Sequence, residues 1–136
     1  MIIKGRKISS GKAEGEAIVC KGPFSFLGDL DPMTGIFSVK GHELEGQNLA
    51  GKIFIFTTGK GSTAGSSIAF QAKLKGTAPA GMICLEVEPI LAAAVIAAKI
   101  PMVDKLDQNP VEVIKTGDWV KLDASEGTVE ISNPRA

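Results

Sequence analysis

The fold is decided by the stretch KIFIFTTGKGSTAGSS, residues 52–67. It begins with a continuous apolar run of strand length, residues 52–56, which is typical of a strand covered on both faces, as in a parallel sheet. A glycine- and serine-rich loop follows, and residues 66–75 have the composition of a helix. Gly76 is well placed to end that helix, which carries two lysines at the negative end of its dipole. The stretch therefore predicts a buried strand, a loop and a helix in direct succession.

The pattern continues toward the C-terminus in the same style. Residues 80–85 form a second apolar run of strand length. Pro89 is suited to the first turn of a second helix, which we expect to include residues 91–98. A short third strand is predicted at residues 100–103. This order is β-α-β-α-β, which is typical of a parallel sheet with right-handed crossovers.

Segments outside this central unit are short and rich in turn residues. We expect strands there at residues 2–3, 17–19, 36–39, 119–122 and 128–131. Turns are predicted at Gly11, at Gly15 and around residues 126–127, and residues 24–35 are expected to form an irregular, functional loop. The whole chain, residues 1–136, is thus predicted to be a single α/β domain with a central parallel β-α-β-α-β unit flanked by short strands.

Composition excludes several classes of protein. The 15 basic residues balance 15 acidic ones, and there is no tyrosine. A neutral surface with few aromatic side chains argues against nucleic-acid and membrane-surface partners. The longest apolar run, residues 90–98, is too short to span a bilayer, and the basic N-terminus lacks the apolar core of a signal peptide. We therefore expect a cytoplasmic protein.

Metal-binding side chains are scarce. The chain has two cysteines, Cys20 and Cys84, and one histidine, His42. A zinc site or an iron–sulfur cluster needs more ligands than these, so we expect this chain to bind no cofactor of its own. Cys84 lies in an apolar run and is predicted to be a buried thiol. His42 is expected to have a structural or substrate-gating role.

Other conspicuous side chains have more than one interpretation. Asp29 and Asp31 lie in the irregular loop, where aspartates commonly stabilise turns, but they could also contact a partner or a substrate. Trp119 is expected in the core or in an interface, because tryptophan is usually well buried.

The loop between the first buried strand and its helix is the candidate functional site. Open α/β sheets bind ligands at this position, and free amides at a helix N-terminus attract anions. Gly59, Gly61 and Gly65 permit tight turns, and the hydroxyl groups of four nearby residues add hydrogen-bond donors, namely Ser62, Thr63, Ser66 and Ser67. No acidic residue occurs between Gly46 and Leu85, whereas four lysines do. A locally positive, anion-binding loop is predicted; the alternative is a serine-rich helix cap without chemistry.

Neither of two familiar phosphate-binding motifs fits this loop. In a Walker loop the lysine directly precedes Ser or Thr, but Gly61 separates Lys60 from Ser62. The glycine spacing also has one residue too many for the Rossmann fingerprint.

At this point the sequence resembles the small subunit of the aconitase X family. Blocks in a matching order, spread over nearly the whole chain, carry the resemblance: FSFLG (24–28), DP (31–32), TG (34–35), LAGK (49–52), GKGSTAGS (59–66), GTAPA (76–80) and IPMV (100–103), with His42, Leu44 and Gly46 between them. The resemblance implies a swivelling β/β/α domain that is the counterpart of the mobile domain of aconitases.

The resemblance also implies a function. It implies a hydro-lyase, active only with a large catalytic subunit that carries a [4Fe–4S] cluster. The proton acceptor of the family falls on Ser62, and we expect Lys60, Gly61, Thr63, Gly65 and Ser66 to contact a small anionic substrate with a carboxylate and a phosphate.

Besides a purely structural subunit, for which the loop hydroxyls would be dispensable, three functions remain open on the sequence. The preferred reaction is dehydration of (R)-5-phosphomevalonate to trans-anhydromevalonate 5-phosphate. The second is dehydration of cis-3-hydroxyproline by a related enzyme. The third, of another class, is anion binding by a regulatory module without catalysis.

Overall fold

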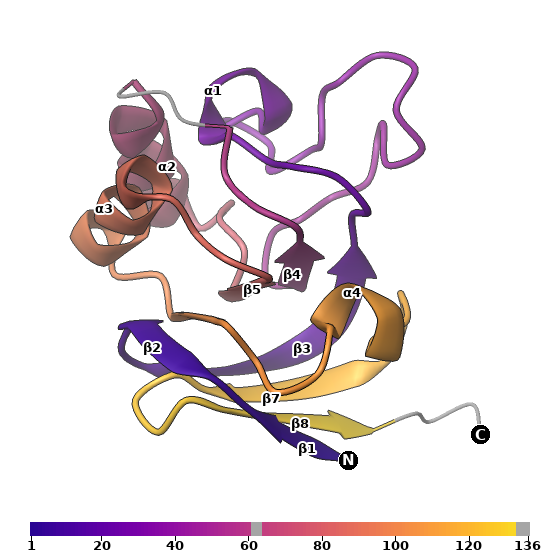
Figure 1. The fold of residues 1–136 in the computed structure, drawn as a ribbon. Coiled ribbons are helices and arrows are strands. Elements are labelled where there is room, and N and C mark those ends of the chain that lie inside the picture. The colour runs from indigo at the N-terminus through magenta and orange to yellow at the C-terminus, as the bar shows by residue number, and fades with distance from the viewer. Residues whose placement is uncertain (61–63, 133–136) are drawn as a thin grey trace.

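The computed structural model describes residues 1–60 and 64–132. Its helices and strands lie in three layers (Figure 1). In chain order they are β1 Ile2–Lys4, β2 Arg6–Ser9, β3 Lys12–Val19, α1 Phe26–Asp29, β4 Ile53–Phe56, α2 Gly65–Lys75, β5 Gly81–Cys84, α3 Pro89–Ala98, β6 Met102–Asp104, α4 Pro110–Val113, β7 Trp119–Asp123 and β8 Thr128–Ser132. The central β4-α2-β5-α3-β6 unit is the predicted one.

Strand β3 connects the two sheet layers. Its first half, from Lys12 to Glu16, pairs antiparallel with β7, and its second half, from Ala17 to Val19, pairs parallel with β4. The described strands follow the order β1-β8-β7-β3-β4-β5-β6-β2, with β3 to β6 parallel. The predicted β/β/α architecture with a central parallel unit is therefore confirmed.

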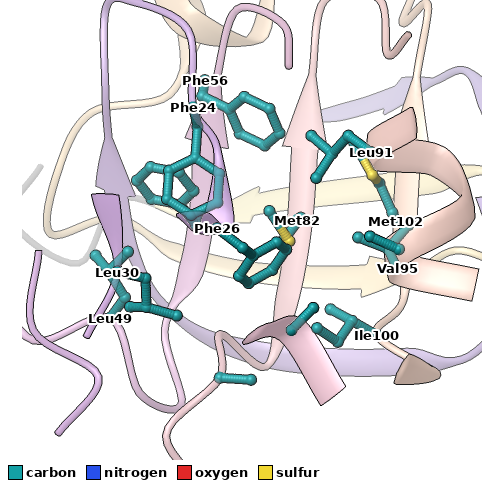
Figure 2. Packing of buried hydrophobic residues seen from close by; sticks show 14 of the residues in the cluster. Phe24, Phe26, Leu30, Leu49, Phe56, Met82, Leu91, Val95, Ile100 and Met102 are labelled. Atoms are coloured by element: carbon teal, nitrogen blue, oxygen red, sulfur yellow. The ribbon is translucent and has the colours of Figure 1, made fainter. Parts of the chain in front are cut away.

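The apolar runs bury both faces of the parallel strands. Phe54 and Phe56 point toward α2 and α3, whereas Ile53 and Ile55 point toward the antiparallel layer. This alternation explains why the run has no polar residue, since each face has its own core. Figure 2 shows the helix-side core, in which Met82 of β5 lies between the phenylalanines and Val95 of α3. Full burial of one such side chain stabilises the fold by about 1.5–3 kcal/mol.

The predicted boundaries of the helices are confirmed. Helix α2 ends at Gly76, which adopts the left-handed conformation and donates its N–H to the carbonyl oxygens of Ala72 and Lys73. Pro89 is the first residue of α3, as expected. Strands β5, β6, β7 and β8 also agree with the predicted segments within two residues.

Two expectations about local structure are wrong, and a third is narrowed. Gly15 is no turn: it lies inside β3, where a Cβ atom would come within 2.8 Å of the carbonyl oxygen of Gly51, so glycine permits close approach of two backbones. Residues 36–39 form no strand in the described structure, only an isolated bridge from Ile36 to Asn48 and one from Phe37 to Leu30. Trp119 was expected in the core or in an interface; the structure excludes the core, because 42% of Trp119 is exposed on the outer face of β7, and the interface stays a prediction.

No helix among the described residues is long and apolar enough to cross a bilayer.

Candidate functional site

The candidate loop lies at the carboxyl edge of the parallel strands. Strand β4 ends at Phe56 and α2 begins at Gly65, so the loop connects them as predicted. Gly61, Ser62 and Thr63 lie outside the described residues. Lys60 and Ala64 bracket them, and the surroundings of these two residues define the environment of the loop.

Residues 24–29 lie beside the first half of this loop. Phe24 donates its N–H to the carbonyl oxygen of Thr58 at 2.9 Å, and Lys60 donates its N–H to the carbonyl oxygen of Phe24 at 3.1 Å. The two segments thus run parallel for one short bridge between Phe24 and Gly59. The irregular loop and the glycine-serine loop, which the sequence analysis treated separately, form one site.

An ion pair joins the two segments. The Nζ atom of Lys60 lies 2.8 Å from Oδ2 and 3.1 Å from Oδ1 of Asp29. Oδ2 of Asp29 also accepts the N–H of Ser25 at 3.0 Å. Asp29 is therefore more than a turn residue, and its carboxylate compensates the charge of Lys60.

The positive charge expected around the loop is compensated in part, because two of the four lysines, Lys52 and Lys60, pair with acids from other segments. Lys52 lies at the other end of β4 and pairs with Glu16 at 3.2 Å. Lys73, in the last turn of α2, donates to the carbonyl oxygen of Lys99. The absence of acids from one stretch of sequence says little about charge in space, because acids from other segments fold against it.

The start of α2 packs on the same irregular loop. Gly65 is buried, and a Cβ atom there would be 3.8 Å from Cβ of Phe26 and 4.0 Å from the backbone nitrogen of Leu27. Ser66 follows as a half-buried residue in the first turn. Ala64 precedes the helix and has no side-chain acceptor, and the first turn contains no acidic residue.

Glu88 borders the site on the side of α3. Its Oε2 accepts the N–H of Ile90 at 2.7 Å, and its Oε1 accepts the N–H of Leu91 at 2.8 Å, which caps α3. Gly59 lies directly against this cap: a Cβ atom there would collide with Oε1 of Glu88 and lie 3.0 Å from Cβ of Leu91. The glycine is therefore needed for close packing between the loop and the start of α3.

A depression of about 440 Å³ opens beside Gly59, between the ends of β4 and β5. It is lined by Thr57, Thr58 and residues 85–89. The buried Asp104 fixes one lining residue, because it accepts the N–H of Val87 at 2.9 Å, and it forms a two-point ion pair with Arg6 at 2.8 and 2.9 Å. The depression can admit part of a small substrate next to the loop.

A larger groove of about 710 Å³ lies elsewhere, on the outer face of the antiparallel layer. Three lysines and three acids line it, together with Ile2, Ala13, Leu122 and Thr128; the charged residues are Lys4, Lys12, Lys121, Glu14, Asp123 and Glu130. Because opposite charges alternate there, the groove offers no excess of positive charge for an anion.

The thiols and the histidine take structural positions. Both cysteines are fully buried, and burial raises the pKa of each thiol, that of Cys84 far above its ordinary range. His42 accepts the N–H of Leu44 on Nδ1 at 3.0 Å, while its Nε2 lies 3.8 Å from Sγ of Cys20. The structural interpretation of His42 therefore fits its contacts. Among residues 1–60 and 64–132, no group of three or more His, Cys, Asp or Glu could hold a metal ion.

Asp31 has a structural role, and two features of the site were not predicted from the sequence. Asp31 stabilises a turn, because its Oδ1 accepts the N–H of Met33 at 2.9 Å. Glu88 was missed by the sequence analysis, although an acid directly before a helix-opening proline is a recognisable capping signal. The pairing of Asp29 with Lys60 had no such signal, because 31 residues separate them.

Comparisons with known proteins agree with this geometry. A family model described as the aconitase X swivel domain matches residues 2–131. A protein of Methanocella arvoryzae named phosphomevalonate dehydratase small subunit is 51% identical over 97% of this chain and all of the relative. The crystal structure of Thermococcus kodakaraensis aconitase X in its holo form superposes with a TM-score of 0.90 at 48% identity, covering 96% of this chain and 98% of that one. A solution NMR structure of a UPF0107 protein matches with a TM-score of 0.88 at 41% identity over 96% of this chain and 98% of its own.

Proposed function

The chain belongs to the aconitase X swivel-domain family, and we propose that it is the small subunit of a dehydratase that converts (R)-5-phosphomevalonate to trans-anhydromevalonate 5-phosphate. The observation that carries this proposal is the full-length likeness to relatives named for that activity, such as those of Methanocella arvoryzae and Methanosarcina acetivorans. The glycine-serine loop at the carboxyl edge of the parallel strands is the place for the chemistry.

The partner is a large subunit, as the name of the relatives implies. We assign the [4Fe–4S] cluster to that subunit. The thiols of this chain do not fit such a cluster, because Cys20 and Cys84 are buried and burial favours their protonated form, whereas cluster ligands are thiolates. When bound in the partner, the cluster would supply a Lewis-acidic iron next to the leaving hydroxyl group.

Ser62 is the proposed proton acceptor. A serine hydroxyl is a poor base unless its alkoxide is stabilised by directed amides, by a helix N-terminus or by a nearby cation. Helix α2 begins at Gly65, three residues after Ser62, and neither Ala64 nor the first turn of α2 supplies an acid that would neutralise the positive end of the helix dipole. Lys60 lies two residues before Ser62, and we propose that Gly61, Thr63, Gly65 and Ser66 contribute amide and hydroxyl donors to the substrate.

The reaction needs one proton transfer by this chain. The alkoxide of Ser62 takes the proton from the carbon next to the substrate carboxylate. The electron pair of that C–H bond becomes the new C=C bond, and the neighbouring C–O bond breaks. The departing hydroxide takes up a proton from solvent and leaves as water, and Ser62 returns its proton to solvent before the next turnover. The carboxylate and the phosphate of the substrate remain unchanged.

We further propose that the loop faces the large subunit. A site that works by proton abstraction benefits from exclusion of water, and a swivelling subunit can open it for product release. Hydrogen exchange in residues 59–66 is expected to slow when the large subunit and substrate are added. Unchanged exchange in these residues, together with protection of another face, would refute this orientation.

The proposed function is tested by a direct assay of the two-subunit complex. The complex is expected to dehydrate (R)-5-phosphomevalonate and to leave cis-3-hydroxyproline unchanged. Turnover of hydroxyproline alone would support the alternative dehydratase instead. If neither substrate reacts while this chain by itself binds small anions, the regulatory module becomes the better interpretation.

A further inference from the structure

We propose that Asp29 is a positioning residue for the dehydration and acts through Lys60. The proposal rests on the function proposed above, since it takes the cation of Lys60 as part of the substrate site. Asp29 itself would not touch the substrate. Its role is to hold the ammonium group of Lys60 in one place and one orientation beside the loop that contains Ser62.

The burial of the two side chains is strongly unequal. The side chain of Asp29 is 6% exposed, whereas that of Lys60 is 43% exposed. The carboxylate therefore lies beneath the surface, whereas the side chain of Lys60 reaches solvent. A surface ion pair with both partners in solvent would fix neither of them.

Backbone contacts fix the carboxylate in turn. Oδ2 of Asp29 accepts the N–H of the buried residue Ser25 at 3.0 Å. The carbonyl oxygen of Phe24, the preceding residue, accepts the N–H of Lys60 at 3.1 Å. Lys60 is thus held at both ends, by its backbone on Phe24 and by its Nζ on Asp29.

The ammonium group keeps a donor for the substrate. A lysine ammonium has three N–H groups, and two of them suffice for Oδ1 and Oδ2 of Asp29 at 3.1 and 2.8 Å. The third can be directed at a carboxylate or phosphate oxygen without breaking the ion pair. A lysine held in this way loses less side-chain entropy on binding a ligand than a free one does.

The test is a double-mutant cycle in the two-subunit complex with (R)-5-phosphomevalonate as substrate. Asp29→Asn keeps the size and the acceptor for the N–H of Ser25 but removes the charge that orients Lys60. We expect it to raise KM about tenfold with a smaller change in kcat, and Lys60→Met to lower kcat/KM by roughly 10–100-fold. The double variant should be no worse than Lys60→Met within about threefold, because the two residues act as one unit.

Asp31→Asn is the matched control, since Asp31 lies in the same loop and contacts the N–H of Met33 instead of Lys60. Its KM should stay within about twofold of the wild type. Wild-type kinetics for Asp29→Asn would overturn the proposal. So would a full tenfold loss from Asp29→Asn when Lys60 is already methionine, because Asp29 would then act independently of Lys60.

A second measurement does not depend on activity. In spectra of the lysine side chains of the full chain, the ε-methylene signal of Lys60 should be separate from those of exposed lysines such as Lys75. Asp29→Asn should move it to the exposed position and Asp31→Asn should not. An unmoved signal would overturn the proposal even if the complex dehydrated neither substrate, whereas a moved signal in an inactive complex would count against the proposed function alone.

Discussion

Helices α2 and α3 both follow a parallel strand and pack side by side (Figure 1), yet they begin in opposite ways. Glu88 caps α3 with both carboxylate oxygens, and Pro89 fills the first helical position. Before α2 stands Ala64, which has no acceptor, and no acid lies in the first turn. The positive end of α3 is thus neutralised by the chain itself, whereas α2 has no charge of its own at that end.

The difference separates a structural helix start from one suited to a ligand. A helix N-terminus that carries its own carboxylate is stable without a bound anion. One without it gains stability when a substrate carboxylate or phosphate supplies the missing charge. The variants below test this contrast, and they are ordered from the largest expected effect to the smallest.

Ser62→Ala should have the largest effect. The variant is expected to assemble with the large subunit and to bind substrate normally, because only a small hydroxyl is lost. Turnover should fall by about two to four orders of magnitude, the usual scale for a positioned proton-transfer group. Steady-state kinetics of the complex would measure this loss.

Solvent exchange of the substrate sharpens the same experiment. In deuterated water, Ser62→Ala should lose exchange of the proton next to the carboxylate together with dehydration. If both persist at near-normal rates, the base must come from the partner subunit.

Gly59→Ala should disturb the start of α3. The added Cβ would collide with Oε1 of Glu88 and press on Leu91, so the cap of α3 must shift. We expect a loss of about 1–3 kcal/mol in the free energy of unfolding, measured by urea denaturation. Gly22→Ala is the control, because no atom lies within 4 Å of its added Cβ. Equal stability of the two variants would show that the loop does not need close contact with α3.

Glu88→Ala should destabilise α3 only. Loss of the two hydrogen bonds to Ile90 and Leu91 should cost about 1 kcal/mol and speed hydrogen exchange in the first turn of α3. Glu86→Ala, an exposed acid two residues earlier, should change stability by less than about 0.5 kcal/mol. If Glu88→Ala were as stable as Glu86→Ala, Glu88 would not stabilise the start of α3. The contrast with the uncapped start of α2 would then be wrong.

Ser66→Ala should have the smallest effect. Ser66 is half-buried in the first turn of α2, so its hydroxyl is expected to contribute at most about 1 kcal/mol to stability. Turnover should fall far less than in Ser62→Ala. A rate loss as large as that of Ser62→Ala would move the proposed base to Ser66.

Elements whose signals are local could be predicted from the sequence. The run at residues 53–56, the glycine that ends α2 and the proline that opens α3 all act within a few residues of where they stand. The loop that connects β4 to α2 was also found from its glycines and hydroxyls. The role of Ser62 comes from the resemblance to a family and stays a prediction.

Features that depend on distant partners could not be predicted. Two such contacts are the Asp29–Lys60 pair and the close approach of Gly15 to Gly51. Each joins segments about 30 residues apart or more, so no local sequence pattern predicts it. The acids that pair with Lys52 and Lys60 lie outside residues 46–85 and could not be predicted for the same reason. The choice between core and interface for Trp119 had no local signal either; its Nε1 donates to Glu14 on an exposed sheet face.

The placement of β1 and β2 has a consequence for how the chain folds as it is made. These strands are separated only by Gly5, yet they form the two opposite ends of the sheet, β1 against β8 and β2 against β6. Residues 2–9 therefore emerge from the ribosome about 100 residues before their partners exist, and they must wait unpaired. Such long-range closure is slow, so the step that completes both ends of the sheet comes late in folding. Until then, both edges stay open to pairing with other chains.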